Sequence, residues 1–265
     1  MNGKANHVRR YKYERWAALP LVLICALLWE ILAHYKVIST LFFPAPSVIV
    51  KTLWTMLLDG EIATNLGISM LRVGIGVAVG VIPGVVLGLT MGWSRRLREA
   101  LDPLVAALNP IPKLAIFPLI MIIFGIGETS KIVAIAITTF FPMLINSMAG
   151  VRQLNPVYFE VAQNYGASKW KIFTRVVLPG SLPMILAGFR IAFNLAFVIT
   201  IAVELLTANS GLGVLIWFSW ITLQTENLYA TLLVIAVIGY LINIVLMKLT
   251  LFLTPWHFHS EANES

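Results

Sequence analysis

Residues 67–92 read GISMLRVGIGVAVGVIPGVVLGLTMG, a continuously apolar run in which Arg72 is the only charged side chain. A helix needs about 20 mostly apolar residues to cross the hydrocarbon core of a bilayer, so the run predicts a transmembrane helix. The absence of alternation argues against a transmembrane strand. Small residues on one track let a second helix approach closely, and we expect that packing here, with a conformational hinge as the alternative. The track is Gly76, Gly80, Gly84, Gly88 and Gly92.

The whole chain has the same apolar character. Of its 265 residues, 59% are hydrophobic and 12% are charged, and the mean hydropathy is +0.87. Soluble domains carry about 25% charged residues, so we exclude a soluble globular protein, a disordered chain and a nucleic-acid-binding protein. The net charge of +7 is expected to reflect cytoplasmic loops that face anionic lipid. A single cysteine excludes an internal disulfide and a cysteine-cluster metal site.

Five further runs are long and apolar enough to cross a bilayer, which predicts an all-α membrane protein with six transmembrane helices. The first run is too long for a signal-peptide core and is followed by no Ala-x-Ala site, so it is expected to remain as a helix. The six predicted spans are residues 16–33, 67–92, 101–124, 132–151, 182–206 and 228–253.

Basic residues indicate how the spans are oriented. Lysine and arginine are frequent before span one, between spans two and three, and between spans four and five, whereas the alternate loops carry few or none. Short loops rich in lysine and arginine remain on the cytoplasmic side. Both termini are therefore predicted to be cytoplasmic.

Two regions are predicted to differ from simple membrane helices. Asn109-Pro110-Ile111-Pro112-Lys113 interrupts span three, because proline removes a backbone donor and disfavours helix before it. Such a break survives only inside protein or beside a water-filled cavity, so it is either part of a translocation path or a kink. After span one, Ser47 is expected to cap a helix over residues 48–58 that lies at the outer interface or packs on the bundle.

The segment between spans four and five carries the most specific pattern. Asn155 followed by Pro156 fits a helix start, and Gly166 fits a helix end. A short amphipathic helix is therefore predicted at about residues 156–168, on the cytoplasmic side. Its apolar face is expected to offer a partner Tyr158, Phe159, Ala162 and Tyr165.

This segment resembles the EAA loop of ABC importer permeases. It contains Glu160-x-Ala162-x-x-x-Gly166 and, after nine intervening residues, Val176-x-Leu178-Pro179. The family consensus has alanine where this chain has Val161 and usually isoleucine where it has Val176. In that family the loop helix docks into a groove of the ATP-binding subunit and transmits its closure. The resemblance assigns this coupling role to Tyr158, Glu160, Ala162, Tyr165, Gly166, Ala167, Leu178 and Pro179.

Other stretches resemble the nitrate/sulfonate/bicarbonate branch of these permeases, and taurine and alkanesulfonate permeases most of all. They include residues 111–119, 124–132, 188–190, 202–205 and 253–257. The resemblance covers nearly the whole chain and implies the type I ABC importer permease fold. It divides the chain into a basic N-terminus (1–15), a first span with an outer segment (16–62), the permease domain (63–247) and a helix end with a tail (248–265).

The resemblance also implies partners. They are a second copy of the permease, two ATP-binding subunits and an extracytoplasmic solute-binding protein, in a bacterial cytoplasmic (inner) membrane. The sequence has no G-x-x-x-x-G-K-[ST] loop to hold ATP phosphates. No cofactor is therefore expected on this chain, and ATP and Mg²⁺ are expected in the ATP-binding subunit.

Polar groups at membrane depth are candidates for the translocation path. They are Lys113, Asn146, Arg190, Asn194 and Glu204. Each has a structural alternative: Lys113 could anchor carbonyls freed by the prolines, Arg190 could form an ion pair or bind a carbonyl, and Asn146 could bond between helices. Glu204 would repel an anion unless it is paired, so a structural or gating role is favoured. Arg72 is expected to snorkel towards the membrane surface.

The leading function is that of a permease for a small anion, with sulfonate or taurine ahead of nitrate, bicarbonate and cyanate. Its energy would come from ATP hydrolysis in a partner chain, so the chain itself is not expected to be an enzyme. The alternative is a secondary transporter driven by an ion gradient, a class that uses inverted repeats and broken helices. No metal site or nucleophile–base pair is visible in the sequence.

Overall fold

The computed structural model describes residues 20–207 and 209–255, and every regular element in them is helical. The helices are Pro20–His34, α2 (Pro46–Leu58), α3 (Glu61–Trp93), α4 (Arg95–Leu108), α5 (Phe117–Phe124), α6 (Glu128–Arg152), α7 (Pro156–Asn164), α8 (Lys169–Ile172), η1 (Phe173–Val177), α9 (Leu178–Thr207), α10 (Leu212–Ile221) and α11 (Thr225–Leu253).

Four of the predicted spans appear as helices long and apolar enough to cross a membrane. In the part of the chain that the structure describes, these are α3, α6, the continuous helical run Lys169–Thr207 that includes α9, and α11. The helix Pro20–His34 is shorter, and the predicted start of span one at residue 16 lies outside the described residues. A count of six spans therefore remains a prediction.

Span three is broken, as its prolines predict. α4 ends at Leu108 and α5 begins at Phe117, with a stretch of turns between them. The loop before span three is much shorter than predicted: Ser94 is the only non-helical residue between α3 and α4. The Ser94 hydroxyl accepts a hydrogen bond from Leu97 N. α4 packs its leucines Leu97 and Leu101 on a buried cluster that includes Met91 of α3 and Leu144 of α6.

The chain divides into two compact units. Among the described residues, the first unit comprises 20–63 and 215–233, and the second comprises 64–207, 209–214 and 234–255. In the first unit, Ser47 does not cap α2: the N-cap is Ala45, and the Ser47 hydroxyl donates to Glu30 Oε1 at 2.7 Å. The carboxylate of Glu30 draws Ser47 into a contact between helices, which sequence-local reasoning could not reveal.

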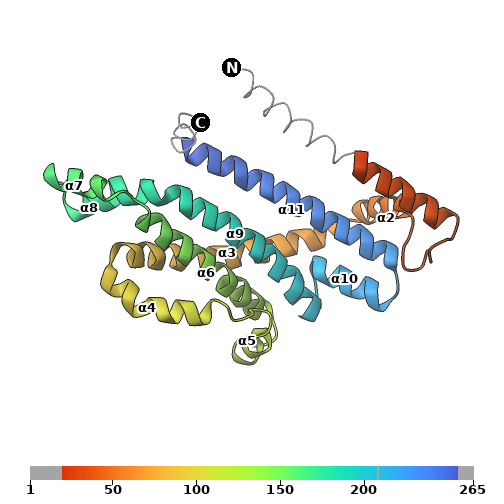
Figure 1. The fold of residues 1–265 in the computed structure, drawn as a ribbon. Coiled ribbons are helices and arrows are strands. Elements are labelled where there is room, and N and C mark those ends of the chain that lie inside the picture. The colour runs from red at the N-terminus through yellow and green to blue at the C-terminus, as the bar shows by residue number, and fades with distance from the viewer. Residues whose placement is uncertain (1–19, 208, 256–265) are drawn as a thin grey trace, which may run out of the picture. The chain divides into compact units, whose positions relative to one another are not determined.

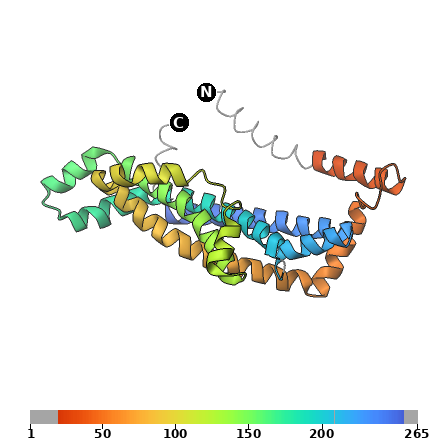
Figure 2. The same cartoon turned by 90° about the horizontal axis from the view of Figure 1, so that it is seen from below.

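In the second unit α3, α6 and α9 run side by side (Figures 1 and 2). The glycine track of α3 lies against α6 along its whole length, as predicted. A Cβ added at Gly76 would lie 2.5 Å from Ile135 Cγ2, and one added at Gly92 would lie 2.6 Å from Val151 Cβ. The contacting residue numbers increase in the same direction along both helices. α3 and α6 therefore run parallel, with their backbones close together.

α9 packs against α6 in the opposite direction. Gly188 faces Asn146, and Gly150 faces Ser181, so residue numbers fall on one helix as they rise on the other. Side chains from α3, α5, α6 and α9 fill one buried cluster, among them Val73, Phe117 and Ile135. The second unit is therefore a tightly packed helical bundle whose two ends hold the groups described next.

Candidate functional site

The segment of residues 155–179 forms one end of the bundle and begins with α7. Asn155 is the N-cap, and its side-chain oxygen accepts a hydrogen bond from Val157 N at 3.0 Å. Pro156 occupies the first turn, where its missing N–H costs nothing. The predicted helix start is confirmed.

α7 ends at Asn164, earlier than the predicted residue 168, because Gly166 adopts φ +69°. Gly166 N donates to Gln163 O and Ala167 N to Ala162 O, the pair of bonds that closes a helix with a left-handed residue. Few residues other than glycine adopt that φ without strain. The Ala162–Gly166 spacing thus sets where α7 stops.

Three aromatic side chains of this segment are largely exposed, although Trp170 stacks on the Phe173 ring with centroids 5.9 Å apart. Tyr158 is 58% exposed, Tyr165 is 88% exposed and Trp170 is 72% exposed. Phe159 was expected on the same face, but it is partly buried and its ring lies 6.1 Å from that of Trp93. Successive residues of a helix are rotated by about 100°, so Phe159 points away from the direction of Tyr158. Phe159 therefore anchors α7 while the tyrosines face outward.

The return into the bundle uses a widened helical turn. Residues Phe173–Val177 form a π-helical turn, in which Leu178 N donates to Phe173 O. Pro179 follows directly, and proline in a helix clashes with the carbonyl four residues earlier. The wide turn relieves that clash, and Leu154 fills the space beside Gly180, so the two ends of the segment meet.

The opposite end of the second unit holds a charge cluster, made of Ser69, Arg72, Glu128, Lys131, Glu204 and Ser210. Arg72, Lys131 and Glu204 are buried in it, whereas the Glu128 side chain is 57% exposed. Arg72 donates to Glu204 Oε1 at 2.7 Å and to both carboxylate oxygens of Glu128, at 2.6 and 2.7 Å. It also donates to the carbonyl and the hydroxyl of Ser210. These contacts use all five guanidinium donors. Arg72 therefore does not snorkel, and its side chain is 3% exposed.

The second carboxylate of this cluster is fully buried. Glu204 is 0% exposed and accepts hydrogen bonds from Ser69 Oγ at 2.8 Å and from Gly213 N at 3.0 Å. Lys131, 2% exposed, donates to Glu128. The two buried cations, Arg72 and Lys131, are thus paired with one buried carboxylate, Glu204, and one exposed carboxylate, Glu128, so that each buried charge has a partner.

The cluster also fixes the chain between α9 and α10. Gly211 N donates to Asn65 Oδ1 and Leu212 N donates to Ser69 Oγ. Gly211 has φ +113°, and a Cβ there would lie 2.5 Å from Glu204 Oε2. Only glycine meets both demands.

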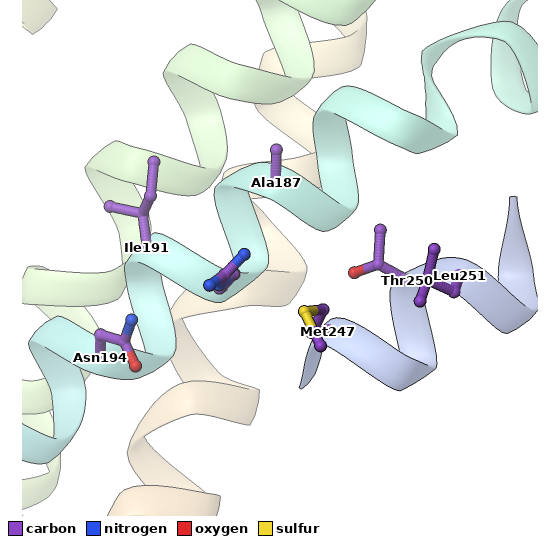
Figure 3. A pocket seen from close by; sticks show the side chains of 7 residues that line it. Ala187, Ile191, Asn194, Met247, Thr250 and Leu251 are labelled. Carbon is purple, nitrogen blue, oxygen red and sulfur yellow. The ribbon is translucent and has the colours of Figure 1, made fainter. Parts of the chain in front are cut away.

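Two of the predicted path residues line a groove of about 600 Å³ between α9 and α11. Figure 3 shows Asn194 and Ala187 on α9 facing Met247 and Thr250 on α11. Arg190 also lines the groove, and its Nε donates to Asn243 Oδ1 at 2.8 Å. Arg190 and Asn194 are both exposed, so the structure brings them together on one accessible surface.

The remaining path candidates are engaged inside the chain. Lys113 Nζ donates to Asn109 O and lies 4.8 Å from the centre of the Phe141 ring. Asn146 Nδ2 donates to Pro142 O on its own helix at 2.8 Å. The Lys113 contact is the carbonyl anchor that the prolines make possible. These candidates and Glu204 lie apart from the groove, so the path residues do not form one site.

Sequence reasoning missed the charge cluster as a unit. Each of its charged members stands out in the sequence, because Arg72, Glu128, Lys131 and Glu204 all lie near the same predicted membrane surface. A signal was available in that shared depth, since charges there need partners. Among the described residues no group of three or more His, Cys, Asp or Glu is placed to hold a metal ion.

Comparison with known proteins gives consistent findings. Residues 84–257 match the family described as "Binding-protein-dependent transport system inner membrane component". The taurine transport system permease protein TauC of Escherichia coli (strain K12) is 36% identical over 262 residues, 95% of each chain. The putative aliphatic sulfonates transport permease protein SsuC of the same organism is 38% identical over 216 residues, 82% of each chain.

The fold also has a solved counterpart. A chain of the MetNI methionine ABC transporter, solved in inward-facing conformations, superposes with a TM-score of 0.62 at 18% identity, over 76% of this chain and 98% of that chain. The resemblance to ABC permeases is thereby confirmed, and so is the all-helical fold.

Proposed function

Because the chain belongs to the family of binding-protein-dependent transport system inner membrane components, we propose that it forms the translocation path of an ATP-driven importer for a small anion. It is a multi-pass inner-membrane protein of a transporter rather than an enzyme. A sulfonate such as taurine is the first candidate substrate, in view of the names of its relatives. Nitrate, bicarbonate and cyanate come next.

The proposed assembly contains two copies of this chain, two ATP-binding subunits and an extracytoplasmic binding protein that delivers the anion. In it the chain crosses the membrane six times with both termini in the cytoplasm. ATP and Mg²⁺ belong to the ATP-binding subunits, and this chain holds no cofactor. The end of the bundle that carries α7 is then cytoplasmic, and the end that carries the charge cluster is extracytoplasmic.

The observation that carries the proposal is the exposed aromatic surface of α7. Tyr158 and Tyr165 project outward while Phe159 fixes the helix to the bundle. Large exposed apolar surfaces on soluble parts of proteins mark partner sites. In the proposed complex this surface contacts the ATP-binding subunit, and the contact includes Glu160, Ala162 and Ala167, with Gly166 shaping the turn and Leu178 and Pro179 guiding the return.

The path residues are proposed with different roles. Arg190 and Asn194 are accessible in the α9–α11 groove, and a cation there favours an anionic substrate. Glu204, fully paired with Arg72, is proposed to act on the shape of the path from outside it. Lys113 and Asn146 are proposed to hold the α4–α5 break and the α6–α9 contact beside it.

The test reconstitutes the chain in liposomes with its ATP-binding subunits and measures ATPase activity and uptake of a labelled sulfonate. Glu160→Lys combined with Ala162→Asp places charges on α7, and Gly166→Pro disturbs its last turn. We expect both variants to insert and fold normally but to lose most uptake and co-purification of the ATP-binding subunit.

The matched control is Asp102→Lys, a charge reversal at an exposed position of α4. It should keep uptake near the parent value. Normal uptake and normal co-purification in the α7 variants would overturn the proposal. Uptake that follows an imposed ion gradient without ATP would instead indicate a secondary transporter.

A further inference from the structure

A second concentration of charge lies at the end of the bundle that carries α7, away from the exposed side chains of Tyr158 and Tyr165. A cavity of about 300 Å³ opens where α3 and α6 end and where α4 and α7 begin. Its lining includes two guanidinium groups, Arg98 and Arg152, the ring of Trp93, and Pro156 and Phe159 of α7. No carboxylate lines it. Cations that converge without an acidic partner are unusual, because like charges repel in a partly desolvated space.

The two arginines retain most of their hydrogen-bonding capacity. Arg98 is half-buried, and its Nη1 makes only two long contacts, 3.5 Å to the carbonyl oxygens of Met91 and of Gly92. Arg152 is exposed, and it has no ion pair or side-chain hydrogen bond with any residue in 20–207 or 209–255. A guanidinium has five donors, so most donors of both side chains are free to bind an added acceptor.

Helix dipoles do not neutralise this charge. The C-termini of α3 and α6 each contribute about −0.5 charge at the cavity, and the N-termini of α4 and α7 each contribute about +0.5. The four ends cancel, which leaves the two full charges of Arg98 and Arg152. The cavity is therefore an open, positively charged space whose wall also contains aromatic and aliphatic side chains.

We propose that this cavity binds a tetrahedral oxyanion between Arg98 and Arg152. The planar fork of arginine matches the paired oxygens of a phosphate group. The phosphate of an anionic lipid headgroup and free inorganic phosphate share this chemistry. A headgroup fits the position, because the cavity lies where two membrane-spanning helices end and basic pockets at that depth bind anionic lipid.

An occupant of this site would act on α7. Pro156 and Phe159 form part of the wall, and the ring contacts continue from Phe159 to Trp93 and from Trp93 to Phe173, each at 6.1 Å. A bound anion therefore fixes the base of the segment of residues 155–179. This consequence for coupling rests on the proposed function, whereas the binding itself does not.

Binding is tested on the full-length chain without ATP or partner subunits. One arm uses nanodiscs of phosphatidylcholine titrated with inorganic phosphate, and the other uses nanodiscs doped with phosphatidylglycerol in phosphate-free buffer. The readouts are amide hydrogen exchange over residues 91–98 and 151–159 and the number of retained phosphatidylglycerol molecules by native mass spectrometry. We expect exchange to slow in at least one arm, and the arm identifies the source of the phosphate group.

Variants distinguish a built site from general surface charge. Arg98→Gln and Arg152→Gln should each weaken binding by about tenfold, since a hydrogen bond to a charged group is worth that much or more. Arg95→Gln is the matched control, because Arg95 is 82% exposed, pairs with Glu99 and does not line the cavity. It should leave binding unchanged.

Three results would overturn the proposal: no protection of the parent chain in either arm, equal loss in Arg95→Gln and Arg98→Gln, or unchanged binding in both cavity variants. If the glutamine variants fail to fold, Arg98→Lys and Arg152→Lys keep the charge but lose the fork. They should then bind several-fold more weakly than the parent, and parent-like binding would count against the site. Loss of transport in a separate assay bears on the coupling role alone.

Discussion

The two ends of the α3–α6–α9 bundle handle their polar and aromatic groups in opposite ways. At one end, Arg72 satisfies all five of its donors within the chain and Glu204 is completely buried. At the other, Tyr165 is 88% exposed and Trp170 is 72% exposed. The first end is complete by itself, while the second leaves apolar surface that a partner can cover. Substitutions at the first should act on stability, and those at the second on assembly.

The largest effect is expected from Arg72→Met. Removing one partner of a buried pair leaves an uncompensated charge and costs about 3–5 kcal/mol, here because Glu204 remains at 0% exposure. The thermal unfolding midpoint of the purified chain should fall sharply. Arg95→Met is the control, since the exposed Arg95–Glu99 pair contributes about 0.5 kcal/mol or less.

A double variant sharpens this result. Arg72→Met combined with Glu204→Gln removes both charges, so its loss of stability should be smaller than the sum of the two single losses. Additive losses would show that the Arg72–Glu204 contact contributes nothing specific.

The next largest effect should come from the contact between α3 and α6, which joins the two ends. A Cβ at Gly84 would lie 2.8 Å from Phe140 O and 2.9 Å from Met143 Cβ, and overpacking of this kind costs about 1–3 kcal/mol. Gly84→Leu should therefore lower the unfolding midpoint. A Cβ added at Gly74 on the same helix meets no atom within 4 Å, so Gly74→Leu should melt like the parent. If Gly84→Leu and Gly74→Leu had the same unfolding midpoint, the close contact between α3 and α6 would be contradicted.

A smaller effect is expected from Lys113→Gln at the break between α4 and α5. It removes a charged donor to Asn109 O and a cation over the Phe141 ring, together worth about 1–2 kcal/mol. The thermal unfolding midpoint should fall, while the rate of uptake should change little. A large drop in uptake with unchanged stability would return Lys113 to the translocation path.

The smallest effect on stability is expected from Tyr165→Ala, whose side chain is 88% exposed. Substitutions at such positions change stability by about 0.5 kcal/mol or less. The affinity of the Tyr165→Ala variant for the ATP-binding subunit should nevertheless fall, as measured by pull-down with purified subunits. A marked loss of stability together with normal affinity would reverse the contrast between the two ends.

Sequence reasoning reached those features that depend on neighbours along the chain. Hydropathy predicted six spans, four of which appear among the described residues as long apolar helices. The glycine spacing predicted the α3–α6 contact, and Pro110 and Pro112 predicted the break in span three. Asn155 and Gly166 likewise predicted the two ends of α7, although the helix stops before residue 165. Each signal is local, because caps, breaks and apolar periodicity act within a few residues.

Contacts between distant residues could not be predicted in this way. Arg72 and Glu204 lie 132 positions apart, so nothing in either neighbourhood reveals the pair. Ser47 looks like a helix cap but bonds to Glu30, and Phe159 looks like a partner contact but packs on Trp93. In each case a single tertiary neighbour decided the outcome.

α6 connects the two contrasting ends as one mechanical element. Its first residue, Glu128, belongs to the charge cluster, and its last, Arg152, lies three residues before Asn155, the N-cap of α7. At 1.5 Å per residue, α6 is about 38 Å long. It packs against α3 along five glycines and against α9 at Gly150 and Gly188. Packed interiors resist compression, so in the proposed complex a displacement of α7 is expected to be passed along α6 towards the charge cluster, with Pro142 as the point where the helix lacks a backbone donor. The non-helical residues that flank α6, 125–127 and 153–155, are then the positions where its two neighbours, α5 and α7, could change direction relative to it.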